Sequence, residues 1–232
     1  MQKNPYPGKL VAFEGMDGCG KTTQCDKAVR YMQAGGENVL KVKEPNKDVL
    51  GGKLIYGLLF GRGPVGFSSM SPLQRQSHYF FNRMRHYVEV VIPALKAGVN
   101  VLSDRSFASI SLEGLLGEDF WQLLLAENYY FEMEEVPFIR PDLVMVYDVT
   151  PEIAYQRLSE KDERRRDFFE QPEKLPQIRR SYQDFVAKFG DFCQVIDASE
   201  DADKVFCSTR ELLRQNFPLK GWKKTEETEE EK

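Results

Sequence analysis

A lysine and a threonine stand next to each other behind closely spaced glycines near the N-terminus. Gly15, Gly20, Lys21 and Thr22 occupy every fixed position of the pattern G-x-x-x-x-G-K-[ST]. Glycines let a backbone wrap a polyphosphate with its N–H groups pointing inward, while the lysine ammonium suits phosphate oxygens and the threonine hydroxyl can ligate Mg²⁺. These residues therefore predict a loop that binds the phosphates of a nucleoside triphosphate.

The flanking segments have the pattern that such a loop requires. Residues 9–15, KLVAFEG, predict a buried strand, and residues 21–33 contain no glycine or proline and predict a helix whose N-terminus faces the phosphates. Four further runs, NVLKVKEP, VNVLSDRS, DLVMVYDV and CQVID, alternate with helical segments. We expect an α/β fold, in which one doubly wound, five-stranded, mostly parallel sheet is flanked by helices in a single domain over residues 1–217.

Composition limits the partners that the chain can have. Its 232 residues carry a net charge of −4, which argues against nucleic acid as the main partner. No apolar run is long enough to cross a membrane and the first residues lack a signal-peptide core, so we expect a soluble, cytoplasmic protein with no membrane partner. Residues 218–232 are charged and poor in apolar side chains, and we expect a disordered tail.

One predicted helix, over residues 72–97, carries aromatic residues and an arginine on one face. Gln76, Tyr79 or Phe80, and Arg83 follow one another at spacings of three and four residues. An aromatic ring and a guanidinium on one face can hold a flat base, by stacking and by hydrogen bonding. The same spacing also fits a core aromatic beside a solvated arginine, so the pattern alone leaves both interpretations open.

Two further groups of charged residues are candidates for phosphate chemistry. Asp104 and Arg105 end the third predicted strand, at the edge where open α/β sheets bind ligands. Arg164, Arg165 and Arg166 lie in a polar insertion, over about residues 159–173, where a mobile lid would close on bound phosphates. A solvated face is the alternative interpretation of these three arginines.

Taken in order, these segments resemble one family, the thymidylate kinases, which are P-loop nucleoside monophosphate kinases. The resemblance rests on FEGMDGCGKTTQ, KEP, the spacing from Tyr79 to Arg83 before IPAL, DRS, PDLVMVYDVTPE, the arginine-bearing lid and VIDAS, spread from about residue 9 to residue 200. It implies transfer of the γ-phosphoryl group of ATP to the 5′-phosphate of thymidylate, with Mg²⁺ as cofactor. It also implies that small nucleotides are the partners and that the chain forms a homodimer.

The resemblance implies roles for individual positions. Asp17 corresponds to the acidic residue that contacts the acceptor's 3′-hydroxyl, Tyr79 to the aromatic that stacks on thymine, and Arg83 to the arginine that binds the edge of the base. The catalytic set that it implies is Lys21, Asp104, Arg105, Arg165 and Arg166, with Thr22 and Asp104 as metal ligands. The implied ATP-binding set is Gly15, Asp17, Gly18, Cys19, Gly20, Lys21, Thr22, Thr23 and Ala198. The implied acceptor-binding set is Asp17, Glu44, Lys47, Tyr79, Arg83, Arg105 and Ser109.

The chain also departs from the family's usual pattern. None of the four variable loop positions is arginine. In this the chain is similar to the family's subtype in which arginines of the lid complete the charge neutralisation. Among the lid arginines, Arg166 is the preferred candidate for that role. Ser106 stands where the family usually has Tyr or His against the sugar, and Phe107 is the candidate to replace that side chain. Ser106 is also similar to the acidic-Arg-Ser signature of deoxynucleoside kinases, for which Glu44 would be the base. Three alternatives therefore stay open: a deoxynucleoside kinase, a monophosphate kinase of other or broader base specificity, and a nucleotide-binding regulator without turnover.

Overall fold

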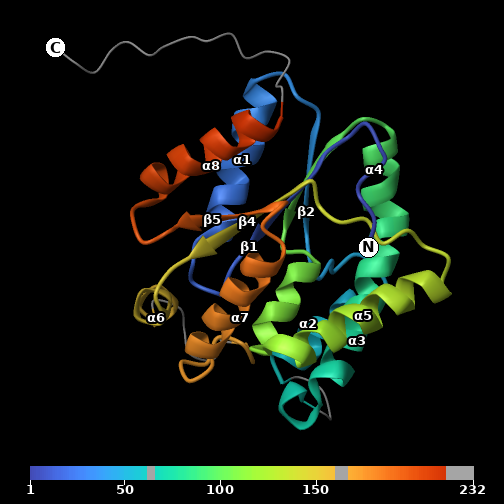
Figure 1. Ribbon diagram of the computed structural model, residues 1–232, viewed down its shortest axis with the longest axis vertical. Coiled ribbons are helices and arrows are strands. Elements are labelled where there is room, and N and C mark those ends of the chain that lie inside the picture. The colour runs from blue at the N-terminus through green and yellow to red at the C-terminus, as the bar shows by residue number, and fades with distance from the viewer. Residues whose placement is uncertain (62–65, 160–166, 218–232) are drawn as a thin grey trace.

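Five parallel strands form the centre of the protein. The computed structural model describes residues 1–61, 66–159 and 167–217, and within these ranges the strands make one sheet in the order β2-β3-β1-β4-β5 (Figure 1). β1 is the middle strand, with Phe13 opposite Asp104 of β3 and Met145 of β4. The five predicted strands are all confirmed. They span Leu10–Glu14, Val39–Lys43, Asn100–Asp104, Leu143–Asp148 and Cys193–Asp197 in the order β1 to β5.

The burial of each strand follows from its place in the sheet. Every residue of β1 is buried, and β4 is buried except at Asp148, because helices cover both faces of a parallel sheet. β2 and β5 are the edge strands and are half exposed, with Val195 of β5 at 52%. Since all strands point the same way, the loop after β1 and the pair Asp104 and Arg105 after β3 meet at one edge of the sheet.

Helices cover both faces of the sheet. α1 and α8 lie side by side at one face, whereas α3, α5 and α7 lie at the other (Figure 1). The α-helices span Lys21–Ala34, Gly52–Leu59, Pro72–His86, Ile92–Lys96, Gly117–Met133, Pro151–Ser159, Leu175–Lys188 and Ala202–Asn216 in the order α1 to α8. Short 3-10 helices span Phe67–Ser69 and Phe107–Glu113.

The helix predicted over residues 72–97 is present, but its hydrogen-bonding pattern changes along its length. α3 passes into a π-helical turn, Tyr87–Val91, and then into α4. Pro93 in the first turn of α4 gives the physical reason, because proline has no N–H to donate and its ring crowds the carbonyl four residues earlier. A wider π turn before the proline relieves that crowding. The sequence pattern predicts the helical path but not this turn.

A cluster of aromatic rings packs between the sheet, α5 and α7. The ring of Phe107 lies 5.7 Å from that of Phe185 in α7 and 5.9 Å from that of Phe138. Phe120 of α5 lies 6.0 Å from the same Phe185 ring. Such edge-to-face contacts fix the 3-10 helix at Phe107–Glu113 and α7 relative to each other. Both elements carry side chains that reach the site described below.

Some expectations fall on residues that the structure does not describe. The proposed lid spans residues 159–173, but residues 160–166 are outside the described ranges, so Arg164, Arg165 and Arg166 are as well. The predicted tail, residues 218–232, is also outside them. Within the described ranges, no helix combines the length and the apolar character needed to cross a membrane.

Candidate active site

The loop between β1 and α1 has the backbone of a phosphate cradle. Gly15, Gly18 and Gly20 have φ angles of 133°, 84° and 89°. A Cβ on Gly18 would lie 2.5 Å from the backbone oxygen of Ala154 in α6, so only glycine fits there. α1 begins directly after the loop, and no side chain among the described residues caps its first turn. The N–H groups of that turn are therefore available to an anion.

Lys21 is 6% exposed and is paired with a carboxylate of its own loop. Its Nζ lies 2.9 Å from Oδ1 of Asp17. Burial and the neighbouring Arg105 act to lower the pKa of the lysine, but Asp17, Cys19 and Asp104 outweigh them and raise it. The ammonium is therefore a fixed positive charge inside the loop.

Thr22 and Asp104 lie together at the carboxyl edge of the sheet. Thr22 Oγ1 donates to Asp104 Oδ2 at 2.7 Å, and Lys43 Nζ is 3.7 Å from the same oxygen. Asp104 Oδ1 is buried and has no hydrogen-bond partner among the described residues. Burial alone would raise the pKa of Asp104, but Lys21, Lys43 and Arg105 hold it below its ordinary value. An ionised carboxylate oxygen without a partner, beside a hydroxyl, fits a hard cation such as Mg²⁺.

Arg105 follows β3 in a backbone conformation that residues other than glycine rarely adopt. Its φ is 84°. Its N–H donates to the Phe13 carbonyl at 3.0 Å, and its carbonyl accepts from Ser103 Oγ at 2.6 Å. Its guanidinium reaches the phosphate loop, where it donates to Asp17 Oδ1 at 2.6 Å and to the Gly15 carbonyl at 3.3 Å. Strained backbone of this kind is concentrated at sites that clamp ligands.

A fully buried carboxylate that the sequence analysis did not single out lies next to this arginine. Glu14, the last residue of β1, accepts from the N–H and the hydroxyl of Ser106 at 2.6 and 2.9 Å. It also accepts from Ser109 Oγ at 2.9 Å, and Arg105 Nη1 is 3.9 Å away. Burial raises the pKa of Glu14, although Arg105 and the hydroxyl donors oppose the rise. The available signal was a single carboxylate at the end of an apolar run.

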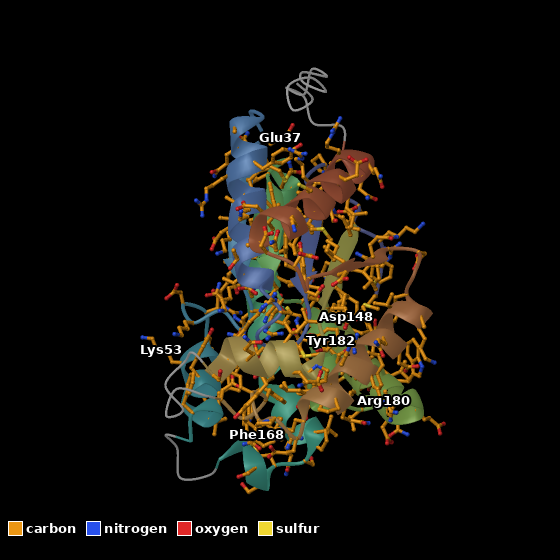
Figure 2. All side chains as sticks on the ribbon, turned by 90° about the vertical axis from the view of Figure 1, so that its left-hand side faces the viewer. Glu37, Lys53, Asp148, Phe168, Arg180 and Tyr182 are labelled. Atoms are coloured by element: carbon orange, nitrogen blue, oxygen red, sulfur yellow. The ribbon has the colours of Figure 1, made fainter. Side chains whose placement is uncertain are left out.

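α7 is anchored to the same edge of the sheet by two side chains. Tyr182 lies toward the middle of the molecule, whereas Arg180 lies at its surface (Figure 2). The Tyr182 hydroxyl donates to Glu14 Oε2 at 2.8 Å. Arg179, three residues earlier, makes two hydrogen bonds of 2.8 and 2.7 Å with the carboxylate of Asp148 at the end of β4. The helix that follows the proposed lid is therefore held to the phosphate-loop strand and to its neighbour.

A cavity of about 250 Å³ lies between the phosphate loop and α3. The loop side of its lining includes Asp17, Lys21, Thr22, Arg105 and Ser109, and the helix side includes Gln76, Tyr79 and Arg83. The helix face that is the candidate base site therefore shares one cavity with the phosphate loop.

Arg83 is buried between two carboxylates at this cavity. Its Nε donates to Glu44, its Nη1 to Glu127 of α5, and its Nη2 to the Ser106 carbonyl at 3.0 Å. Burial would raise the pKa of Glu44, but Arg83 and His86 hold it below its ordinary value. Burial raises the pKa of Glu127 to about 7, with Arg83 opposing the rise. No local sequence signal pointed to Glu127.

The described residues of the proposed lid, 167–173, line one side of the cavity. Asp167 and Glu170 line it, and Phe168 lies against the start of α3, with its ring centre 4.9 Å from the guanidinium carbon of Arg75 (Figure 2). Carboxylate oxygens of Asp17, Asp167 and Glu170 lie within 4.8 Å of one another. Burial, and then the charges of Asp17 and Glu170, raise the pKa of Asp167 to about 7.

A second cavity, of about 320 Å³, borders the phosphate loop. Gly20 and Thr23 line it from the loop and α1, and Ala198 lines it from the segment after β5. Arg157 of α6 also lines it and donates to the carbonyls of Ala198 and Ser199 at 2.9 and 3.0 Å. The structure therefore places Ala198, a residue of the implied ATP-binding set, in one cavity lining with Gly20 and Thr23.

Three other side chains of interest lie away from the first cavity's lining. Lys47 Nζ lies 4.0 Å from the centre of the Tyr56 ring, and it is Tyr56 that lines the cavity. Phe107 is fully buried in the aromatic cluster. The Ser106 hydroxyl is turned to Glu14. The structure thus brings most of the predicted residues together, but leaves these three outside the cavity.

Fold and site together define a P-loop nucleotide-binding protein of the α/β class. A family model described as thymidylate kinase matches residues 13–208. Relatives named thymidylate kinase include one from Bifidobacterium longum subsp. infantis, 30% identical over 90% of this chain and 89% of its own length. A second relative, from Thermosipho melanesiensis, is 31% identical over 88% of this chain and 96% of its own length. A third, from Mesoplasma florum, is 29% identical over 93% of this chain and 98% of its own length. The chain belongs to the thymidylate kinase family.

Proposed function

We propose that the protein transfers the γ-phosphoryl group of ATP to the 5′-phosphate of dTMP, giving dTDP and ADP. The observation that carries this proposal is the single cavity lined by Lys21, Thr22 and Arg105 on one side and by Tyr79 on the other. Donor phosphates and acceptor can meet in that space, as phosphoryl transfer requires. Membership of the thymidylate kinase family supports thymidylate as the acceptor.

The donor is assigned to the phosphate loop and its neighbours. The loop backbone and Lys21 hold the phosphates, and the second cavity, lined by Ala198, takes the nucleoside end. Oxygens of Thr22 and Asp104 hold Mg²⁺, which when bound neutralises charge on the phosphates. The proposed ATP contacts are Gly15, Asp17, Gly18, Cys19, Gly20, Lys21, Thr22, Thr23 and Ala198.

The acceptor is assigned to the α3 side of the first cavity. The Tyr79 ring offers a face on which a base can stack, and Arg105 offers a guanidinium to the acceptor phosphate. Asp17 of the loop lines the same cavity and offers a carboxylate to a sugar hydroxyl of the acceptor. The proposed acceptor contacts are Asp17, Glu44, Lys47, Tyr79, Arg83, Arg105 and Ser109. Of these, Lys47 would have to leave the Tyr56 ring to reach a phosphate.

The reaction needs alignment and charge neutralisation more than proton transfer. An oxygen of the acceptor phosphate, already ionised near neutral pH, attacks the γ-phosphorus while the bond to the β-phosphate oxygen breaks and ADP leaves. Lys21 and Arg105 keep their positive charges. Both donate to Asp17, and the phosphates would compete with this carboxylate for the two cations. We propose that Arg165 and Arg166, outside the described residues, add the remaining positive charge.

The alternative deoxynucleoside kinase would need a carboxylate base near a neutral 5′-hydroxyl. Glu44 is the candidate, but Arg83 binds it and its pKa is held below the ordinary value. A carboxylate stabilised in its ionised form is a weak proton acceptor. This contact favours a monophosphate acceptor over a nucleoside.

A coupled ADP-release assay with ATP, Mg²⁺ and a panel of dTMP, dUMP, dCMP, dGMP, AMP and thymidine tests the proposal. We expect the highest kcat/KM with dTMP. Activity on thymidine alone would refute a monophosphate kinase, and absence of ADP release with every acceptor of the panel would leave only a regulator. A Lys21→Met preparation, purified in the same way, reports any contaminating kinase.

We further propose that the chain forms a homodimer and acts in the cytoplasm. Leu54 in α2 and Leu73 in α3 are 56% and 52% exposed, and such apolar side chains are available to an interface. The four cysteines are free thiols, which suits a reducing compartment. Size-exclusion chromatography with light scattering distinguishes a 26.8 kDa monomer from a dimer, and cell fractionation tests the location.

A further inference from the structure

The amide of one cavity-lining glutamine is locked in a single orientation. Gln76, on α3 one turn before Tyr79, is 3% exposed, and its Nε2 donates to Glu113 Oε1 at 2.9 Å. An ionised carboxylate only accepts hydrogen bonds, so the amide nitrogen must face Glu113. The carbonyl oxygen of Gln76 therefore faces away from Glu113, and no donor to it occurs in the described part of the chain.

Glu113 is itself held firmly in place. Its side chain is fully buried, and Arg75 donates to it from Nε at 2.9 Å and from Nη2 at 2.5 Å. Arg75 Nη1 in turn donates to the Phe67 carbonyl at 3.2 Å. Such a two-pronged arginine–carboxylate pair fixes direction as well as distance. Arg75 and Glu113 are therefore positioning residues for the Gln76 amide.

The neighbouring arginine is already engaged by the protein. Each nitrogen of the Arg83 guanidinium donates to a protein acceptor, namely Glu44, Glu127 or the Ser106 carbonyl. The Ser109 hydroxyl gives its proton to Glu14. A base that stacks on Tyr79 thus meets, in Gln76, a neutral acceptor whose direction is set before the base arrives.

We propose that Gln76 is a specificity-determining residue that accepts a hydrogen bond from a ring N–H of the acceptor base. The inference deepens the proposed function and rests on it. Thymine and uracil carry a hydrogen on N3, whereas N3 of cytosine carries a lone pair that would face the glutamine oxygen. The locked amide therefore admits dTMP and dUMP and rejects dCMP, because a buried acceptor left facing another acceptor is costly.

Steady-state kinetics with dTMP and dCMP test the assignment. Gln76→Leu keeps the approximate size of the side chain and removes the acceptor. We expect kcat/KM for dTMP to fall about 10- to 100-fold and that for dCMP to change little, so the ratio between them falls by a similar factor. Gln122→Leu, the same change at an exposed position of α5, is the control and should leave both values unchanged.

Glu113→Gln tests the orientation without touching the glutamine. A glutamine at position 113 can donate to the Gln76 oxygen, which lets the Gln76 amide turn its nitrogen toward the base. We expect kcat/KM for dCMP to rise while circular dichroism shows an intact fold. Equal losses for dTMP and dCMP in Gln76→Leu, or an unchanged ratio in both variants, would overturn the inference. A wild-type protein inactive on every monophosphate would instead overturn the proposed function.

Discussion

The hydrogen bond from Tyr182 to Glu14 joins α7 to the strand that carries the phosphate loop, and its removal has a predictable cost. Tyr182→Phe keeps the ring, which is 3% exposed, and deletes only the hydroxyl that donates to Glu14 Oε2 at 2.8 Å. A hydrogen bond to a charged group contributes about 1.5–3 kcal/mol. Because Ser106 and Ser109 still donate to this carboxylate, we expect a loss near the lower end, about 2 kcal/mol.

The size of this loss should depend on pH. Burial already raises the pKa of Glu14, and the Tyr182 hydroxyl is one of the groups that oppose the rise. Without that hydroxyl the pKa of Glu14 rises further, so the folded variant holds the Glu14 proton to a still higher pH, while the unfolded chain releases it near the ordinary value. The stability that the group contributes is then lost as pH increases above the unfolded value. The variant should therefore be destabilised more at pH 8 than at pH 5.

Urea denaturation at both pH values measures the effect. For a domain of this size, 2 kcal/mol corresponds to a fall in Tm of about 4–8 °C. Tyr129→Phe, at a tyrosine of α5 that is 62% exposed, is the matched control and should cost less than about 0.5 kcal/mol. In a Glu14→Gln background the Tyr182→Phe change should cost about 1 kcal/mol less. If Tyr182→Phe behaves like the Tyr129→Phe control at both pH values, the hydrogen bond does not anchor α7.

Three further predictions follow from the site. Lys21→Ala should lower kcat about 10²- to 10³-fold with an unchanged circular dichroism spectrum, because it removes a buried positive charge from the phosphate loop; near-normal turnover would exclude the loop from the mechanism. Asp104→Asn should raise the Mg²⁺ concentration for half-maximal activity by about tenfold, since it removes the charge of the proposed metal ligand, and an unchanged Mg²⁺ titration would contradict that role. Burial and the charges of Asp17 and Glu170 raise the pKa of Asp167 to about 7. Between about pH 4 and pH 7 the folded protein therefore keeps the Asp167 proton that the unfolded chain has released. The stability that Asp167 contributes is lost as the pH rises through this range. Asp167→Asn should therefore raise the free energy of unfolding by about 1 kcal/mol at pH 8 and leave it unchanged at pH 4 in urea titrations, and an equal change at both values would show that the carboxylate cluster does not set it.

Local sequence signals were sufficient for the strands, the phosphate loop and the candidate base-binding face. β1 and β4 lie in the middle of the sheet and must be apolar throughout, so their runs stand out from the rest of the chain. The loop needs glycine at fixed positions for its dihedral angles, as Gly18 shows. Gln76, Tyr79 and Arg83 share a face because helical spacing alone puts them there.

Other parts of the site depend on partners that are remote in the chain. The sequence could not show that Glu14 would meet Tyr182, 168 residues away, or that Arg83 would meet Glu127, 44 residues away. It could not show whether Phe107 would face the sugar or the aromatic cluster, nor that Lys47 would lie over Tyr56. The order and packing of the strands and helices decide these contacts.

The sequence by itself thus determined which strands and helices form and which loop is the candidate site for a triphosphate, because dihedral preference and hydrophobic period act over a few neighbouring residues. Only the tertiary structure decided how the buried charges pair and how the Gln76 amide is turned. A buried charge must find a partner wherever the fold brings one, and spacing along the chain carries no record of that choice.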